Sequence, residues 1–254
     1  MSDPRPPASA GASAPRPRRV GHKGAAHIEP GNTLASFDAA LRHGVDMIEL
    51  DVLAERPDGS GRLLVAHDRT DAASRRAPSF EEALDHLCAP AFAGIELDVD
   101  IKLPGYELRV LAALRERELI DRTLISGMFT DGLSQIRKAE PTLRLGWSVP
   151  RVRRDYTTDM LTAIPALAIL TGYRAMLPRR ARRALQEGRY DAIMAHWRVV
   201  TGALVRAVRE GGGQLYVWTV DDARMIDRLS AMGVDGIITN DPRLFQPISQ
   251  AAAE

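Results

Sequence analysis

The feature that most constrains the fold is the regular alternation of strand-like and helix-like patterns from Val20 onward. Runs rich in Val, Ile and Leu are typical of strands buried in a parallel sheet, and the stretches between them are typical of covering helices. This alternation predicts right-handed βαβ units. Strands are expected at 19–22, 46–53, 62–66, 94–101, 123–126, 143–148, 191–195, 214–219 and 236–239. Helices are expected at 33–43, 79–88, 106–118, 130–139, 157–171, 178–187, 201–211 and 222–232.

About eight strand–helix pairs follow one another without an internal linker, which predicts one α/β domain, a TIM (β/α)8 barrel over residues 20–254. The main alternative is a doubly wound open sheet, but no G-x-G-x-x-G motif follows the first strand. Pro165 and Pro178 are expected to interrupt the helical pattern between the sixth and seventh barrel strands. Residues 1–19 are rich in Pro, Ala and Arg and are predicted to form a disordered basic tail.

The composition gives no reason to expect a nucleic-acid or membrane partner, because the formal net charge is only +1. The single cysteine, Cys88, cannot form an internal disulfide and is expected to pack in the apolar face of the helix around 81–87. No apolar run is long enough to span a bilayer, and the first 19 residues lack the hydrophobic segment of a secretory signal. We therefore expect a cytoplasmic protein without stable membrane insertion; the sequence does not indicate an oligomeric state.

Polar residues with catalytic potential follow three of the apolar runs. They lie in Gly21-His22-Lys23-Gly24, in Glu49-Leu50-Asp51 and in His67-Asp68. The C-terminal ends of the strands are where an α/β barrel carries its active site. Glu49 and Asp51 are two residues apart, so on a strand they point to the same side and repel unless a cation or proton lies between them. Oxygen-only ligation favours Mg²⁺ or Ca²⁺ over zinc.

The strand expected at 94–101 alternates charged and apolar residues, and the pattern continues to Lys102. We expect the apolar set to face the helices and the charged set to face the barrel interior, where charges are costly unless paired or metal-bound. Asp100 and Lys102 are nearest the C-terminal end and would reach the active face. Glu96 and Asp98 would lie deeper, paired with interior arginines.

Six motifs occur together in one order and spacing. They are His22-Lys23-Gly24-Ala25, Gly31-Asn32-Thr33, Gly44-Val45-Asp46-Met47-Ile48-Glu49-Leu50-Asp51-Val52, His67-Asp68, Asp100-Ile101-Lys102, and the stretch from Tyr216-Val217-Trp218 to Thr239-Asn240-Asp241-Pro242. In this order they resemble the glycerophosphodiester phosphodiesterase family, over roughly residues 20–245. The resemblance implies a TIM barrel that holds one divalent cation, Mg²⁺ or Ca²⁺.

The same resemblance implies a role for each matching residue. Glu49, Asp51 and Asp100 would be the metal ligands, and His22 and His67 the general acid and base. Histidine suits proton transfer because its ordinary pKa is near neutrality. Lys23 and Lys102 would bind the phosphate and balance the charge that develops on its oxygens. Trp218 would stand at the barrel mouth, either as a wall for the substrate or as part of the core.

The sequence departs from the family pattern at four places. Gly31 stands where Glu usually precedes Asn-Thr, and Glu29 is the candidate replacement. Lys23 replaces the commoner Arg and so loses a bidentate phosphate contact, and Asp100 replaces the commoner Glu. Only residues 68–77 stand where the family usually has a longer covering insertion, so we expect an open mouth. An Asp-x-Lys pair is also similar to the spider-venom phospholipase D toxins, which release cyclic phosphates.

The favoured interpretation is metal-dependent hydrolysis of glycerophosphodiesters or lysophospholipids to glycerol phosphate and an alcohol, by paired-histidine acid–base catalysis. The expected partner is thus a small-molecule phosphodiester or a lysophospholipid. One alternative is a phospholipase D-like enzyme that releases a cyclic phosphate. Another is a non-catalytic barrel that binds a phosphorylated ligand, a hypothesis motivated by Gly31.

Overall fold

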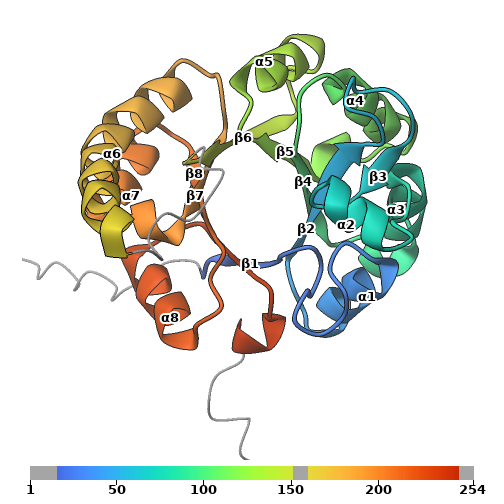
Figure 1. The fold of residues 1–254 in the computed structure, drawn as a ribbon, viewed down its shortest axis with the longest axis horizontal. Helices are drawn as coiled ribbons and strands as arrows, with labels where there is room; N and C mark the ends of the chain where they lie inside the picture. Colours follow the sequence, from blue (N-terminus) through green and yellow to red (C-terminus); the bar gives the residue numbers. More distant parts are fainter. Residues whose placement is uncertain (1–15, 151–159, 246–254) are drawn as a thin grey trace, which may run out of the picture.

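The computed structural model describes residues 16–150 and 160–245, and for residues 160–169 it describes the backbone alone. Eight parallel strands close into a barrel (Figure 1). Their order is β1-β9-β8-β7-β6-β5-β4-β2, and β1 also pairs with β2, which closes the ring. The strands are β1 (Arg18–Gly21), β2 (Met47–Ala54), β4 (Glu96–Ile101), β5 (Thr123–Gly127), β6 (Arg144–Val149), β7 (Ala192–His196), β8 (Gln214–Trp218) and β9 (Gly236–Thr239).

The predicted barrel is therefore confirmed, with two adjustments to the strands. The expected strand at 62–66 is β3 (Leu63–Val65), which pairs antiparallel with the end of β2 and lies outside the ring. The first strand begins at Arg18, inside the predicted 1–19 tail, because Arg18 and Arg19 pair with residues of β9. Residues 1–15 of that tail lie outside the described residues.

Helices surround the strands in the described part of the chain (Figure 1). The α-helices are α1 (Leu34–Arg42), α2 (Arg69–Ser74), α3 (Phe80–Leu87), α4 (Glu107–Glu116), α5 (Thr130–Ala139), α6 (Met160–Gln186), α7 (Gly202–Glu210) and α8 (Ala223–Met232). Thr33 caps α1 by accepting a hydrogen bond from the Ser36 amide, and Gly233 ends α8 with a φ of 77°. Short 3₁₀ turns lie at Pro90–Phe92, Ile120–Arg122, Trp197–Val199 and Pro242–Phe245.

Three local expectations were wrong. The helices expected at 157–171 and 178–187 are one helix, α6, which runs through both prolines. Burial of Leu177, Ala181 and Leu185 outweighs the backbone hydrogen bond lost at Pro178. The short helix α2, capped by Asp68, was not expected. Cys88 is exposed at the end of α3 and does not pack in its apolar face.

The barrel interior is apolar in its middle layer and charged at both ends. Met47, Leu124, Met194, Tyr216 and Ile238 are among the side chains that fill the middle. Gly236 makes room for the large ring of that layer, because a Cβ there would lie 2.3 Å from the Tyr216 ring.

At the N-terminal end of the barrel, Glu96 accepts hydrogen bonds from Arg18 and Arg144, each at 3.0 Å, as predicted. The same prediction was wrong for Asp98, which has no arginine partner among the described residues. Asp98 is 1 % exposed, and burial raises its pKa to about 7. Burial therefore favours the protonated form of this deep carboxyl, which no arginine in the described residues pairs with.

Candidate active site

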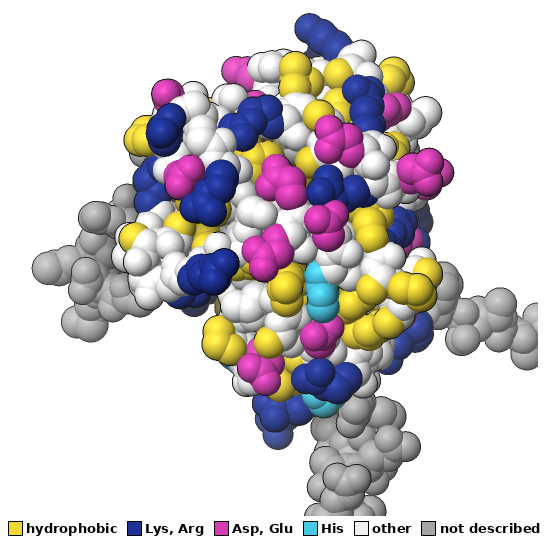
Figure 2. Space-filling view, turned by 90° about the vertical axis from the view of Figure 1, so that its right-hand side faces the viewer, with side chains coloured by type: hydrophobic (Ala, Val, Ile, Leu, Met, Phe, Trp, Pro, Cys, Tyr) yellow, Lys and Arg dark blue, Asp and Glu magenta, His cyan; other side chains and the backbone are white. Residues whose placement is uncertain are grey.

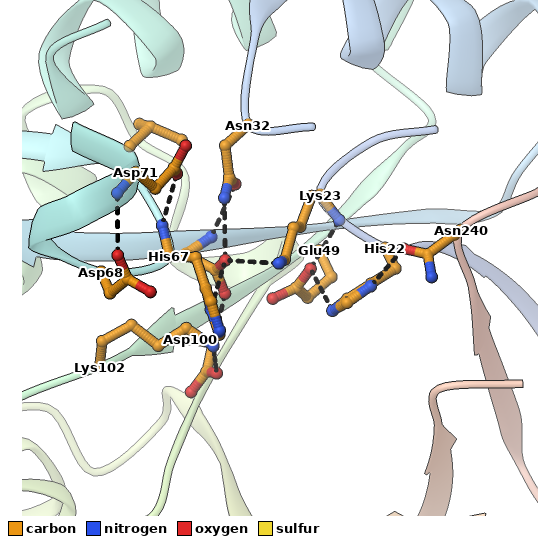
Figure 3. A network of polar contacts seen from close by, with 12 residues as sticks. His22, Lys23, Asn32, Glu49, His67, Asp68, Asp71, Asp100, Lys102 and Asn240 are labelled. Atoms are coloured by element: carbon orange, nitrogen blue, oxygen red, sulfur yellow. Dashed lines mark hydrogen bonds and ion pairs between the residues drawn. The ribbon is translucent and has the colours of Figure 1, made fainter. Parts of the chain in front are cut away.

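Apart from Trp218 on β8, the predicted site residues lie on or just after the neighbouring strands β1, β2, β3 and β4, at one face of the barrel (Figure 3). Glu49 and Asp51 lie on β2, and Asp100 lies on β4 opposite Asp51 in the parallel register. His22 and Lys23 follow β1 directly, and β1 pairs with β2 on its other side. Because these strands are neighbours, alternate residues along them face the same interior space.

The three carboxylates converge as predicted. One ligand oxygen each from Glu49, Asp51 and Asp100 lies within 4.8 Å of the others. Glu49 is 4 % exposed and Asp51 is fully buried, whereas Asp100 is partly exposed. Burial, followed by repulsion from Asp51, raises the pKa of Glu49 well above its ordinary range. This excess of buried negative charge is what a divalent cation would neutralise, and an all-oxygen donor set fits Mg²⁺ or Ca²⁺.

Two lysines balance part of that charge. Lys102 Nζ lies 2.5 Å from both Asp51 Oδ1 and Asp100 Oδ2, and Lys23 Nζ lies 3.8 Å from Asp51 Oδ2. Burial opposes ionisation of Asp51, but Lys102 and further partners hold its pKa well below the ordinary range. Likewise, burial opposes the Lys102 charge, but Asp100 and Asp51 raise the pKa of Lys102 well above its ordinary value. The site thus holds fixed positive charge beside the carboxylates.

His22 is held in one orientation by the end of β9 (Figure 3). Its Nδ1 lies 2.7 Å from Asn240 Oδ1, and its Nε2 lies 3.8 Å from Glu49 Oε2. The Asn240 amide is fixed in turn, because its Nδ2 and its backbone N–H both donate to Asp221, at 2.7 and 2.8 Å. With the amide oxygen facing His22, the neutral ring carries its proton on Nδ1 and leaves Nε2 free to accept one.

The environments of the two histidines differ. Burial lowers the pKa of His22 to about 4, so its ring is neutral at neutral pH. His67 lies between β3 and α2, where its side chain is 52 % exposed and its Nδ1 is 3.4 Å from Asp51 Oδ2. The backbone N–H of His67 donates to Asp71 on α2 at 3.0 Å. One histidine is therefore enclosed and the other stands at the open side, with the carboxylates between them.

The chain also matches a known protein family. The model of the glycerophosphoryl diester phosphodiesterase family matches residues 22–78 and 78–244. The chain belongs to this family. It is accordingly a phosphoric diester hydrolase. The match contains every site residue predicted from the sequence.

Individual relatives are similar over most of their length. The glycerophosphodiester phosphodiesterase of Caldanaerobacter subterraneus subsp. tengcongensis is 27% identical over an alignment of 255 positions, which covers 88% of this chain and 93% of that protein. A solved glycerophosphodiester phosphodiesterase from Parabacteroides distasonis has a TM-score of 0.69 at 18% identity, covering 94% of this chain and 99% of that chain. An Oleispira antarctica phosphodiesterase, solved with its product sn-glycerol-3-phosphate, has a TM-score of 0.65 at 18% identity, covering 94% and 98%. At these identities the two solved structures support the fold alone.

The structure adds to this site a residue that the sequence analysis named only as part of the Gly31-Asn32-Thr33 motif. Asn32 is 1 % exposed and pairs with Asp51 at two points. Its Nδ2 donates to Asp51 Oδ2 at 2.8 Å, and its Oδ1 accepts from the Asp51 backbone N–H at 3.1 Å. Thr33 is the residue that caps α1. Asn32 therefore orients a metal-ligand candidate, as outer hydrogen-bond partners of metal ligands commonly do.

Gly31, where the phosphodiesterase family usually has Glu, lies against the Lys23 side chain. A Cβ at Gly31 would be 3.0 Å from Lys23 Cβ and 3.1 Å from Ala26 Cβ, so a larger residue would displace its neighbours. Glu29, the proposed replacement, makes no side-chain hydrogen bond or ion pair within residues 16–150 and 160–245. The described contacts therefore give no support to that replacement.

Trp218 stands at the C-terminal end of β8 and is packed into the barrel. Its Nε1 donates to Met194 O at 2.9 Å, and its ring meets His196 edge-on, with centroids 5.1 Å apart. It also packs against the apolar middle layer of the barrel. The core-packing alternative is thus observed, while contact of its partly exposed ring with substrate stays a prediction.

Proposed function

We propose that this phosphodiesterase cleaves glycerophosphodiesters to glycerol phosphate and an alcohol, or lysophospholipids to an acylated glycerol phosphate and an alcohol, using one divalent cation at Glu49, Asp51 and Asp100. The observation that carries the proposal is the convergence of these carboxylates within 4.8 Å beside two lysines and two histidines. When bound, Mg²⁺ or Ca²⁺ would supply positive charge against the non-bridging phosphate oxygens. Lys23 and Lys102 would bind those oxygens from the protein side.

We assign the general base to His22 and the general acid to His67. The neutral ring of His22 keeps Nε2 open to accept a proton, since Asn240 occupies Nδ1. His67 is half exposed, on the side where a leaving alcohol would depart to solvent. In this arrangement His22 removes the proton of the substrate hydroxyl that attacks phosphorus, and His67 protonates the departing oxygen. Water then opens the resulting cyclic phosphate to the linear monoester.

A second product is favoured by one feature of the site. The Asp100-x-Lys102 pair is similar to that of enzymes that release a cyclic phosphate, and Lys102 contacts Asp100 at 2.5 Å. In that route a hydroxyl of the substrate attacks phosphorus, and the cyclic product leaves before water opens it.

Cytoplasmic localisation is also part of the proposal, supported by the lone cysteine.

The test is an assay of chelator-treated protein with glycerophosphocholine, with Mg²⁺ or Ca²⁺ added back, and product analysis by phosphorus NMR. We expect turnover to depend on the cation and to yield a linear monoester. Glu49→Gln should abolish cation-dependent turnover, whereas Asp227→Asn, which changes an exposed carboxyl on α8, should not. Activity that survives chelation would disprove the metal assignment, and accumulation of a cyclic phosphate would favour the second product.

A further inference from the structure

The side chains of α6 and α7 concentrate positive charge in a protein that is almost neutral overall. The net charge of the chain is +1, yet these two helices carry seven arginines and a single acidic residue, Glu210. By contrast, α3 carries three acidic residues and no lysine or arginine. Figure 2 shows the side of the barrel that bears α3 and α4, where acidic and basic side chains are interspersed. The two basic helices lie on the opposite side in Figure 1.

A groove of about 220 Å³ runs between the two basic helices. Pro178, Ala203 and Ala207 form its small apolar walls, and three guanidinium groups and one carboxylate complete its lining. The charged residues of the lining are Arg179, Arg182, Arg206 and Glu210.

Two of these arginines are available to a ligand. Arg182 pairs with Glu210 across the groove at 3.0 Å. Arg179 and Arg206 make no hydrogen bond or ion pair with any residue in the described ranges. Neither residue belongs to the phosphodiester site at the barrel mouth. Unpaired guanidiniums on opposite walls of a small groove are suited to a phosphate group, which accepts from several N–H donors at once.

The surroundings of the groove favour a lipid surface over a nucleic acid. Met176 on α6 is 56 % exposed and lies one turn before Arg179. A helix that combines apolar residues with a cluster of arginines is typical of binding to anionic bilayers, where the basic residues meet phosphates and the apolar residues enter the interface.

We propose that the groove between α6 and α7, with the arginines around it, binds the phosphate groups of an anionic phospholipid bilayer. The protein then attaches to the surface peripherally, in agreement with the finding that none of its described helices is long and apolar enough to cross a membrane. The inference does not depend on which phosphodiester the barrel cleaves, because the groove and the catalytic carboxylates lie on different elements.

The test is sedimentation of the full chain with vesicles of phosphatidylcholine alone and of phosphatidylcholine mixed with phosphatidylglycerol. We expect binding only to the anionic vesicles, and release by high salt because exposed charges are then screened. The variant Arg179→Glu/Arg206→Glu should lower the partition coefficient by at least about tenfold. The matched control, Arg224→Glu/Arg228→Glu on α8, makes the same change in net charge and should keep binding within about twofold of the wild type.

Three results would overturn the proposal. The first is equal binding to neutral and anionic vesicles, and the second is an equal loss in the groove variant and the control. The third is binding to duplex DNA that depends on Arg179 and Arg206 in the absence of vesicle binding, which would indicate a nucleic-acid partner. Unchanged turnover of a soluble phosphodiester by the groove variant verifies that it is folded.

Discussion

Asn240 fixes the ring of His22, with its Oδ1 2.7 Å from the Nδ1 of the histidine. Asp221 fixes Asn240 through two further hydrogen bonds. The three residues form a linear series in which only His22 faces the carboxylates, so Asp221 acts on the reaction through Asn240. Asn240 and Asp221 are therefore positioning residues for the proposed base.

We predict that Asn240→Ala lowers kcat by roughly ten- to a hundredfold, because the His22 ring can then rotate and change tautomer. KM should change less, since both residues act through His22 and neither is among the residues proposed to bind the phosphate. Asp221→Ala should have a smaller effect in the same direction. The decisive measurement is the kcat of the double variant. If the residues act in series, its kcat falls no further than that of Asn240→Ala alone. Losses in kcat that multiply would show that Asp221 does not act through Asn240.

Removal of either histidine should be more damaging than removal of its support. We predict that His22→Ala and His67→Ala each reduce turnover at least about a hundredfold, the usual scale for acid–base groups. Thermal stability should change little for His67→Ala, because its side chain is half exposed. A steady-state assay with glycerophosphocholine and a thermal melt test both points. Near-wild-type turnover in either variant would refute paired-histidine catalysis.

Asn32 should influence cation affinity without touching the cation. In Asn32→Ala, Asp51 Oδ2 loses its 2.8 Å amide donor inside a buried site. We predict cation binding weaker by roughly ten- to a hundredfold, the usual cost of removing an outer partner of a metal ligand. Isothermal titration with Mg²⁺ and Ca²⁺ measures this affinity. Thr201→Ala, which removes the cap of α7, is a control expected to lower stability but not cation affinity.

Much of the fold and of the carboxylate cluster could be predicted from local pattern. The strand ends were predicted to within about two residues, because apolar runs in this chain stop where polar residues begin. Side chains alternate between the two faces of a strand, so Glu49 and Asp51, two residues apart, lie on the same side. The carboxylate cluster could be predicted because β2 and β4 are neighbouring strands, which brings Asp100 beside Asp51.

The support around the histidine could not be predicted in the same way. Asn240 and His22 are 218 residues apart and meet only because β9 pairs with β1 when the barrel closes. The role of Asn32 at Asp51 could not be inferred from local sequence, because an Asn just before a helix is equally typical of a helix cap. Pro178 misled the helix prediction because propensity does not include the burial of Leu177 and Leu185.

Closure of the barrel should depend on Asp46, which precedes β2 and accepts a hydrogen bond from the Arg19 backbone in β1 at 2.8 Å. Burial opposes its ionisation, but hydrogen bonds from Arg16 and Arg19 bring the pKa of Asp46 down to about 2, from an ordinary value of 3.8. Because the pKa of Asp46 is lower in the folded protein, its ionised carboxylate stabilises the fold at pH values above 3.8. This stabilisation is lost as the pH falls toward 2.

We therefore predict that Asp46→Asn lowers the free energy of unfolding by about 1–2 kcal/mol at neutral pH, and by progressively less as the solution is acidified. Denaturant titration of both proteins across that range measures the difference. Asp85→Asn is the control, because the Asp85 side chain is 67 % exposed and its ion pair with Arg117 is at the surface. A deficit that does not depend on pH would show that Asp46 acts through shape rather than charge.

Head-group recognition should be relaxed at the mouth of this barrel. In place of a longer insertion, only the short helix α2 (Arg69–Ser74) follows His67, and none of its residues is buried. Discrimination between substrates requires transition-state contacts to the group that varies, and here that group is the leaving alcohol. Trp218 at the end of β8 is the aromatic candidate for such a contact, but its indole N–H already donates to the Met194 carbonyl oxygen.

We therefore predict that choline, ethanolamine, glycerol and inositol esters of glycerol phosphate, and one lysophospholipid, have kcat/KM values within about a hundredfold of one another. Steady-state kinetics with Mg²⁺ and with Ca²⁺ test this on one protein preparation. Trp218→Phe keeps an aromatic ring but removes the bond to Met194, so it should change the ranking of the esters little if the ring is mainly a packing element. A preference beyond about a thousandfold, equivalent to about 4 kcal/mol, would require a specific pocket for one alcohol. Residues outside α2 would have to form that pocket, because α2 is exposed and too short to enclose a leaving group.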